Sequence, residues 1–382
     1  MLAQLEFSRS SEFQDFLRAL FGYERINIEL VQGVTIDFHP LWLLMWDAHQ
    51  RTGSDIEHYD FYWPLNELVR QRPRFARRPN PNWRPGAWKH FSQRQGKGLD
   101  EPFIVKISIT PGGDSVSRNE LYAFADQQKA FFCTVEERPV ARAAANVQGS
   151  TSMMANDDGT LGGFLKDQNT GKIFGVTCAH VATTPNTQVN LTDVGGTTYN
   201  NAGTVTHTTY SNLVITGARG CNNTITWQSD HVDIALFEPD AHHTPQNTVS
   251  TIGLIDAIFD YSQFDSGTDV VMRGTVSGKH TYQVGAFCAI YRVLFNDGNF
   301  RCFNNIFEIT SSSGRSPWLP QKIAIRPAAG DSGAWVCADS VSGNYAYCGT
   351  LIAVDDFSGY ACFAQAVRDW AIDKHNIDLV PF

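Results

Sequence analysis

The sequence predicts an all-β sandwich or barrel domain over residues 141–382, preceded by a smaller α+β domain over residues 1–140. Three observations predict the larger domain. Short β-rich segments follow one another through it, clusters of Gly, Asn, Asp and Thr separate them, and the last segment has helical periodicity. With 382 residues, 42% hydrophobic and 12% aromatic, the chain is long enough to bury two cores.

The expected strands of the larger domain are short and end at turn-forming residues. They are residues 160–165, 172–178, 189–191, 232–237, 269–273, 285–295, 322–325, 334–338 and 345–354. Residues 363–377 then place Phe363, Val367, Trp370 and Ala371 on one face, which predicts a terminal amphipathic helix.

The domain boundary is expected between residues 138 and 152, where Pro, Ala and a Gly-Ser-Thr-Ser run replace the earlier aromatic density. In the smaller domain, residues 11–21 predict a helix with a capping box formed by Ser11 and Gln14. No nucleotide-binding loop, metal motif or repeat occurs there, so we expect this domain to regulate or target the larger one. Its other expected elements are strands at 25–31, 34–38 and 103–109, a short helix at 41–49 and a helix that begins at Ser117.

Residues 70–97 form a basic arm with nine Lys or Arg residues and no Asp or Glu, in a chain of net charge −9. Proline and aromatic residues are interleaved with the cations, so the segment is expected to be extended. One interpretation is a solvated loop whose aromatic residues pack on the parent domain. The other is a docking site for an acidic regulatory partner or for nucleic acid, because cations release counterions from phosphates and aromatic rings stack on bases.

The sequence begins without a basic, then apolar, secretory signal and contains no run of about 18 apolar residues. A cytoplasmic location and no membrane partner are therefore expected. The eight cysteines are spread without zinc-type CxxC pairs, so we expect them to be free and buried and expect no bound metal or other cofactor.

Three short motifs supply the parts of a nucleophilic serine site. They are Thr177-Cys178-Ala179-His180, Asp233-Ile234-Ala235-Leu236 and Gly330-Asp331-Ser332-Gly333. A serine hydroxyl is a poor nucleophile at neutral pH, so it needs an imidazole to take its proton and a carboxylate to orient and support that imidazole. The chain carries all three groups in the order His, Asp, Ser, at separations of 53 and 99 positions.

With these motifs, residues from about 150 to 382 resemble the trypsin- and chymotrypsin-like serine proteases of the PA clan, and among them the bacterial, non-secreted members. The resemblance implies an all-β double six-stranded barrel with a C-terminal helix. Secreted trypsins carry cysteines where this chain has Val181 and Ala328, a departure that supports an intracellular relative. The resemblance to these proteases also implies an endopeptidase that acts on protein or peptide substrates.

The resemblance assigns a role to each site residue. His180 is the general base and then the general acid, Asp233 fixes the histidine tautomer, and Ser332 is the nucleophile. The backbone N–H groups of Gly330 and Ser332 form the oxyanion hole, and Asp331 supports that hole.

Other candidate residues fit these roles less well. Ser115 and Ser266 lack one of the two glycines that flank Ser332, and Asp230 is followed by a polar residue and not by an apolar run. His231, His242 and His243 have no metal-ligand spacing and are expected to be exposed loop histidines.

Two interpretations of the substrate pocket remain open. Arg326, six residues before Ser332, corresponds by resemblance to the bottom of the specificity pocket and would attract an acidic side chain. Alternatively Arg326 points to solvent, and Ala353 and Val354 shape a small apolar pocket.

Activation is also open, because no cleavable Arg-Ile-Val-Gly-Gly sequence occurs. Either Asp331 is satisfied internally, or the N-terminal domain and a partner control the site. The predicted function is an intracellular serine endopeptidase. The alternatives are a catalytically silent protease-like binding module and an adaptor that binds nucleic acid or an acidic partner through residues 70–97.

Overall fold

The computed structural model describes most of the larger domain and four parts of the smaller one. The described residues are 2–20, 26–32, 103–109, 132–137, 140–143, 152–213, 215–216, 231–263, 267–304, 306–311, 327–355 and 358–382. The chain divides into two compact units, Ala3–Arg138 and Pro139–Phe382, the second including Met1–Leu2. Each unit is described by itself.

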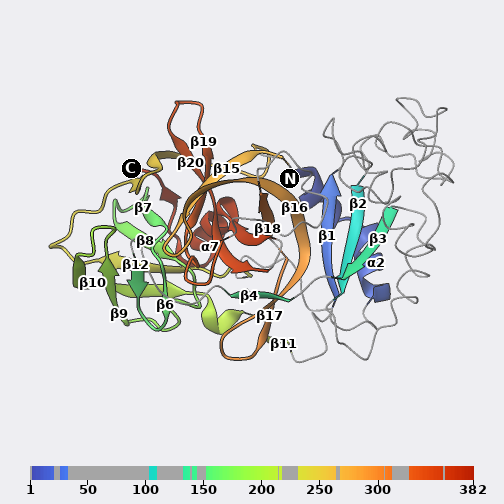
Figure 1. Cartoon of the computed structure of the whole chain (residues 1–382), viewed down its shortest axis with the longest axis horizontal. Coiled ribbons are helices and arrows are strands. Elements are labelled where there is room, and N and C mark those ends of the chain that lie inside the picture. The colour runs from blue at the N-terminus through green and yellow to red at the C-terminus, as the bar shows by residue number, and fades with distance from the viewer. Residues whose placement is uncertain are drawn as a thin grey trace. The chain divides into compact units, whose positions relative to one another are not determined.

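The N-terminal unit contains two short helices and a sheet (Figure 1). The helices are α1 (Leu2–Ser8) and α2 (Ser11–Leu20), and the strands are β1 (Ile26–Gln32), β2 (Phe103–Ile109) and β3 (Phe132–Glu137). β1 pairs antiparallel with β2, and β2 pairs parallel with β3. The apolar residues that alternate along β1 and β2 are buried, and the polar Asn27, Glu29 and Ser108 between them are buried as well.

The α2 helix begins where expected, but its cap is one residue earlier than the sequence suggested. The Ser10 hydroxyl accepts a hydrogen bond from the Phe13 N–H at 3.2 Å, and the Gln14 side chain donates to the Ser8 carbonyl at 2.8 Å. Gln14 therefore does not close a capping box with Ser11, because its side chain bonds the Ser8 carbonyl at the end of α1. The α1 helix was not predicted from the sequence. The expected elements at 34–38, 41–49 and Ser117 lie outside the described residues, as does the basic arm at 70–97.

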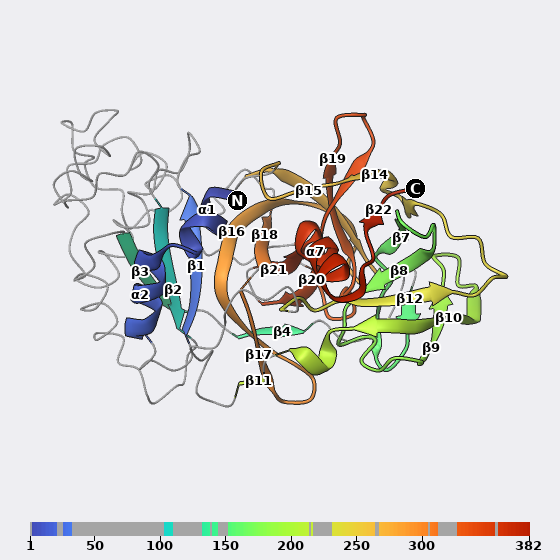
Figure 2. The same cartoon turned by 180° about the vertical axis from the view of Figure 1, so that it is seen from behind.

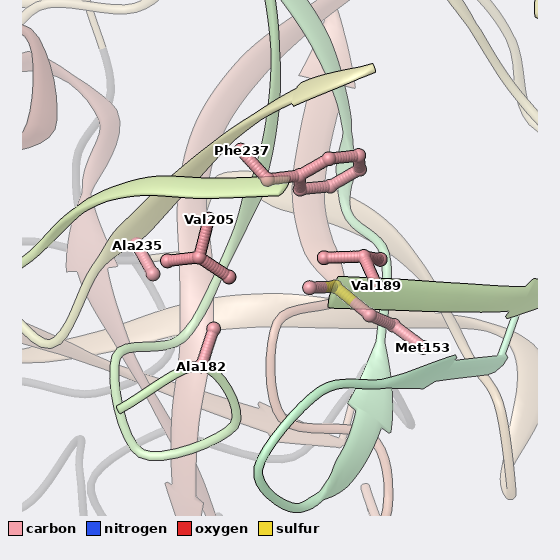
Figure 3. Packing of buried hydrophobic residues seen from close by; sticks show 6 residues of the cluster. All are labelled: Met153, Ala182, Val189, Val205, Ala235 and Phe237. Carbon is pink, nitrogen blue, oxygen red and sulfur yellow. The ribbon is translucent and has the colours of Figure 1, made fainter. Parts of the chain in front are cut away.

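The first sheet of the larger unit is antiparallel and curled, in the order β22-β7-β8-β12-β10-β9-β5-β6. Its strands are β5 (Ser152–Met154), β6 (Asp158–Thr160), β7 (Gly163–Asp167), β8 (Ile173–Thr177), β9 (Gln188–Thr192), β10 (Thr198–Thr208), β12 (Ala235–Pro239) and β22 (Leu379–Val380). Figure 3 shows side chains from four of these strands and from the turn after β8 converging on one apolar core. That core comprises Met153, Ala182, Val189, Val205, Ala235 and Phe237.

The second sheet of the larger unit contains a closed ring of six antiparallel strands. Around the ring, β15 pairs with β16, β16 with β18, β18 with β21, β21 with β20, β20 with β19, and β19 with β15. These strands are β15 (Asp269–Gly274), β16 (Gly278–Leu294), β18 (Ile306–Ser311), β19 (Trp335–Asp339), β20 (Tyr345–Val354) and β21 (Gly359–Phe363). Closure leaves the ring without unpaired strand edges.

Shorter strands extend this barrel. They are β4 (Ala141–Ala143), β11 (Ile215–Thr216), β13 (Thr248–Val249), β14 (Gly253–Ile258) and β17 (Phe300–Phe303). The α7 helix (Ala364–His375) packs against β20, β21 and β22 and buries Val367, Trp370 and Ala371 (Figure 2). The expected all-β architecture with a C-terminal helix is therefore confirmed.

Several strand boundaries differ from the prediction. β16 is one long curved strand that starts at Gly278 and not at residue 285 (Figure 1). The expected strand at 160–165 is interrupted between Thr160 and Gly163, because both ends of the break bond elsewhere: Thr160 N–H donates to Ser332 O and Gly162 N–H to Val176 O. Residues 322–325 lie outside the described residues.

The cysteines follow the prediction only in part. Cys178, Cys288, Cys337, Cys348 and Cys362 are free and buried, whereas Cys302 is disulfide-bonded. Disulfides are rare in cytosolic proteins, so this bond weighs against the cytoplasmic expectation. Among the described helices, none is long and apolar enough to cross a membrane.

Candidate active site

His180 lies in the turn that follows β8, where this interior strand of the first sheet ends. Its neighbours Cys178, Ala179 and Val181 are fully buried, so they anchor the turn in the core. The His180 backbone N–H donates to Asp233 Oδ1 at 3.0 Å, and its ring Nδ1 lies 2.5 Å from Asp233 Oδ2. One carboxylate therefore holds both the backbone and the ring of the histidine.

Asp233 lies two residues before β12, in a loop and not within the strand expected at 232–237. The residue is fully buried, and its neighbour Ile234 accepts a hydrogen bond at its carbonyl from the Thr209 N–H at 3.0 Å. Shielding from water strengthens the attraction between this carboxylate and a protonated imidazole. The carboxylate takes the proton-bearing Nδ1, which leaves His180 Nε2 facing away from it.

Ser332 lies in the turn before β19 of the second sheet, and its Oγ is 2.8 Å from His180 Nε2. The flanking Gly330 and Gly333 have φ values of +101° and +96°, which side-chain-bearing residues rarely adopt. A Cβ on Gly333 would also lie 2.1 Å from the Thr160 carbonyl oxygen. The two sheets thus bring His180, Asp233 and Ser332 into one connected set, hereafter the His-Asp-Ser set.

The nucleophile turn, Gly330–Gly333, has four backbone N–H groups. Two of them donate hydrogen bonds to carbonyl groups of the chain, and the other two have no such acceptor among the described residues. The Asp331 N–H donates to Ala328 O at 3.1 Å, and the Gly333 N–H donates to Leu351 O at 2.9 Å. The N–H groups of Gly330 and Ser332 donate to no acceptor within the described part of the chain. These are the two donors that the resemblance assigns to the oxyanion.

The Asp331 side chain is fully buried and is satisfied by backbone amides. Its Oδ1 accepts from Val276 N–H at 2.7 Å and Ser277 N–H at 3.1 Å, and its Oδ2 accepts from Ala328 N–H at 2.7 Å. No Lys or Arg among the residues with described side chains pairs with it. The sequence left two possibilities open for Asp331. In the structure, backbone N–H groups of the chain itself bond its carboxylate, which corresponds to the first of them.

A second group of residues reaches the histidine ring through Phe295, and the prediction from the sequence did not include it. The Phe295 ring meets the His180 imidazole edge to face, with 5.3 Å between centroids. The buried Arg301 guanidinium lies 4.4 Å from the Phe295 centroid and 4.6 Å from that of Tyr210, and it forms a bidentate pair with Asp297 at 2.7 and 3.0 Å. These bonds hold the pKa of the Asp297 carboxyl below its usual range. An arginine flanked by aromatic residues in a strand was the available sequence signal.

Cys178 lies beside the His-Asp-Ser set and joins His180 and Asp233 in a group of three possible metal-ligand atoms within 4.8 Å. These atoms are already engaged. The Cys178 thiol donates to Leu351 O at 3.1 Å, and the histidine and aspartate bond each other. Burial, with a contribution from the Asp233 charge, raises the pKa of the Cys178 thiol well above its usual range, which disfavours the thiolate that a metal needs.

The expected pocket residues are only partly described. Arg326 lies outside the described residues. Ala353 is buried and Val354 is half-buried on β20, the strand whose Leu351 carbonyl accepts the Gly333 N–H. They therefore lie two and three residues along β20 from the carbonyl that bonds the nucleophile turn, and their part in a substrate pocket stays a prediction.

The rival candidates take no part in the bonds that join His180, Asp233 and Ser332, or they lie outside the described residues. His242 is exposed, and His243 stacks edge to face on Tyr199. His231, expected in an exposed loop, is instead 3% exposed, because the loop before β12 runs through the interior. Ser115, Asp230 and Ser266 lie outside the described residues.

The architecture of this unit, two curled antiparallel sheets of which one closes into a six-stranded barrel, is the one that the sequence resemblance implies. The fold is chymotrypsin-like. No protein-family model and no curated protein sequence matches the chain.

Solved structures of serine proteases match part of the chain. They include a glutamic acid specific serine protease that uses a histidine triad in substrate binding, at 14% identity, with 62% of this chain and 100% of that chain covered and a TM-score of 0.38. Nocardiopsis protease matches at 13%, covering 62% and 100%, with a TM-score of 0.36. Thermobifida fusca protease A matches at 13%, covering 62% and 99%, with a TM-score of 0.38.

Proposed function

We propose that this protein is a serine endopeptidase that hydrolyses peptide bonds through an acyl-enzyme intermediate. The observation that carries the proposal is the unbroken hydrogen-bonded path from the Asp233 carboxylate through His180 to the Ser332 hydroxyl, at 2.5 and 2.8 Å. Both distances are within the reach that proton transfer between nucleophile and base requires.

In the proposed acylation step, Ser332 Oγ attacks the carbonyl carbon of the scissile peptide while its proton passes to His180 Nε2. The carbonyl oxygen takes the displaced electron pair and accepts hydrogen bonds from the Gly330 and Ser332 N–H groups, each worth about 3 kcal/mol in such sites. The tetrahedral intermediate then expels the amine, which takes the proton from His180. An ester on Ser332 remains.

Deacylation repeats the sequence with water in place of serine. His180 takes a proton from the water as its oxygen attacks the ester carbonyl, and the same two amides hold the second oxyanion. The intermediate releases the carboxylic acid, and Ser332 recovers its proton from His180. Asp233 keeps its charge throughout and stabilises the imidazolium. The chemistry requires no cofactor.

The amide-bound Asp331 supports a site that is formed without proteolytic activation. In trypsin-like zymogens a new amino terminus must pair with the aspartate before the nucleophile. Here three backbone amides already occupy that carboxylate. We therefore propose that the chain is active without cleavage, and that any control by residues 1–140 or by a partner acts on access to the site.

The substrate preference is proposed from residue chemistry alone. With Arg326 at the pocket base, the enzyme would cleave after acidic residues; with Arg326 turned outward, Ala353 and Val354 would favour small apolar side chains. Cleavage of a peptide library, read for the residue before the cut, separates these two preferences. A preference for Lys or Arg contradicts both.

A fluorophosphonate probe tests the proposed function, because it labels only an activated serine. We expect labelling of the wild type, loss of labelling in Ser332→Ala and His180→Ala, and retention in Ser340→Ala, whose hydroxyl lies in the exposed β19–β20 turn. An unlabelled wild type would favour the silent binding module.

The adaptor alternative is tested separately through residues 70–97. Binding to RNA or DNA that weakens steeply with salt supports it, because each phosphate contact releases counterions. No retention on either polymer at low salt would exclude nucleic acid as the partner.

A further inference from the structure

Thr160 connects the first sheet to the nucleophile turn of the second sheet. The residue ends β6 and is only 2% exposed. Its N–H donates to Ser332 O at 2.8 Å, and its carbonyl accepts from the Thr177 hydroxyl at 2.9 Å. The backbone of Thr160 is therefore fixed on both sides, which gives its side chain a defined position beside the nucleophile.

The Thr160 hydroxyl has three partners in this position. Its Oγ1 lies 2.8 Å from Gly330 O and 2.6 Å from Thr275 Oγ1, and it accepts from the Thr275 N–H at 3.1 Å. A hydroxyl has one proton, and a carbonyl oxygen can only accept. The Thr160 hydroxyl therefore shares its one proton between Gly330 O and Thr275 Oγ1, while its oxygen accepts from the Thr275 N–H.

The bond to Gly330 O matters because glycine does not fix its own conformation. The peptide that joins Gly330 to Asp331 is held at its carbonyl by Thr160 and at its N–H by Ala328 O. The adjacent peptide carries the Gly330 N–H, the proposed oxyanion donor. With φ at +101° and no Cβ, only the neighbouring peptide and its restraints set the direction of that N–H.

The turn between β15 and β16 holds the same segment from a second side. Thr275 in this turn contacts Thr160, while the next two amides, of Val276 and Ser277, bind the Asp331 carboxylate. One turn therefore holds both the side chain of Asp331 and, through Thr160, the carbonyl of Gly330.

We propose that Thr160 and Thr275 form a hydroxyl pair that positions the Gly330 amide for oxyanion binding, with Thr160 as the positioning residue. This inference rests on the proposed protease function. Neither hydroxyl touches the reacting atoms, so both act through the nucleophile turn. Because the oxyanion forms only in the transition state, loss of the pair lowers kcat and leaves KM nearly unchanged.

The test compares Thr160→Val, which keeps the shape and removes the hydroxyl, with Thr160→Ser, which keeps the hydroxyl. With a peptide substrate we expect Thr160→Val to lower kcat by about 10- to 100-fold with KM changed less than about 3-fold, as for a misplaced oxyanion donor. Thr160→Ser should recover most of the loss. Thr206→Val is the matched control, because its hydroxyl lies in the same sheet and bonds Leu236 O at 3.3 Å; its kcat should equal that of the wild type.

Thr275→Val gives an independent measurement if Thr160→Val does not fold. It should lower kcat in the same direction, and the double variant should lose less than the product of the two single losses, because both belong to one pair. A folded Thr160→Val or Thr275→Val enzyme with wild-type kcat would overturn the proposal, as would fully multiplicative losses. Fluorophosphonate labelling of wild type but not of Ser332→Ala, measured first, separates failure of this inference from failure of the protease function, and an unlabelled wild type overturns both.

Discussion

The ring of His180 is held on two sides by different physical means. Asp233 bonds one edge, and the edge-to-face contact with Phe295 limits rotation of the ring. Phe295 is in turn stacked against Arg301, whose guanidinium is fixed by Asp297. An error in the orientation of this ring changes the Nε2 to Oγ distance directly, so residues that never contact substrate contribute to the rate.

Arg301→Lys tests this support. A lysine keeps the charge but loses the bidentate fork and the flat stacking surface, so Phe295 is less well held. We expect kcat to fall by about 3- to 10-fold, a modest fraction of the roughly 100-fold cost of a 1 Å misplacement. Arg368→Lys, at a partly exposed pair with Asp378 remote in sequence from the site, is the control for steady-state kinetics. Equal kcat in both variants would show that Arg301 does not support the ring.

The Asp297 carboxyl makes part of the stability depend on pH. Its bonds from Arg301 lower its pKa in the folded state, so the stabilisation is fully present above the unfolded pKa of about 3.9 and is lost as the pH falls below it. We expect Asp297→Asn to be less stable than wild type in urea unfolding at pH 7, with a gap that narrows between about pH 4 and pH 2. A gap that stays constant with pH would show that the charge is not responsible.

Among the elements, the β15–β16 turn has the most direct influence on the site. A Cβ on Gly274 would lie 2.1 Å from the Asp331 carboxylate, so this position must be glycine for the carboxylate to reach the amides of Val276 and Ser277. The turn and the nucleophile segment are therefore packed as one unit.

Gly274→Ala is expected to displace Asp331 and lower kcat by about 100-fold or more, the cost of losing an oxyanion donor. Gly195→Ala is the control, since its nearest neighbour is the partly exposed Asp193 side chain at 3.2 Å. Activity and circular dichroism are measured for both. A folded Gly274→Ala protein with normal kcat would mean that Asp331 is not needed in its present position.

The α7 helix carries a pH-sensitive contact at its C-terminal end. The centroids of the His375 ring and the His207 ring of β10 are 4.2 Å apart. The charges of Glu238 and Lys172 act on His207, and the charge of Lys374 acts on His375. Burial, then the charges of His207 and Lys374, lowers the pKa of His375 to about 4, and burial also lowers the pKa of His207. Both rings are therefore neutral in the folded protein at pH 7.

Because the folded pKa of His375 is below its unfolded value of about 6.5, the unfolded state binds more protons between these values, and stability falls as the pH drops from about 6.5 to 4. The melting temperature of His375→Gln should therefore fall less than that of the wild type as the pH is lowered through this range. Scanning calorimetry at pH 7 and pH 4.5 measures the difference. Identical losses in the two proteins would exclude this contact as the source.

At the scale of the whole molecule, every described contact that holds His180, Asp233 and Ser332 comes from residues beyond 139. A chain of residues 139–382 is therefore expected to be labelled by fluorophosphonate at Ser332. If the N-terminal unit regulates the enzyme, the labelling rate or the binding of a partner should differ from that of the full chain. The same rate and the same partners would end the regulatory hypothesis, whereas an unlabelled truncated chain would show that the unit is part of the fold.

Sequence patterns correctly predicted those elements whose structure depends on residues close together in the chain. Tyr345–Val354 and Phe103–Ile109 were predicted to the residue, because alternation and β-branched content act within a strand. The length of β16 was underestimated because its first half carries polar residues along the exposed part of a barrel hairpin. The Ser10 cap was missed because a neighbouring helix changed the partner of Gln14.

The sequence by itself determined the residue types of the site and their order along the chain, because a nucleophile, a base and a carboxylate each occupy a short motif with recognisable neighbours. Only the tertiary structure decided what holds them. Thr160 reaches Gly330 across 170 residues, and Asp331 is satisfied by amides 54 and 55 residues away. Backbone amides and threonine hydroxyls occur throughout the sequence, so only their positions in space distinguish those that position a reacting group.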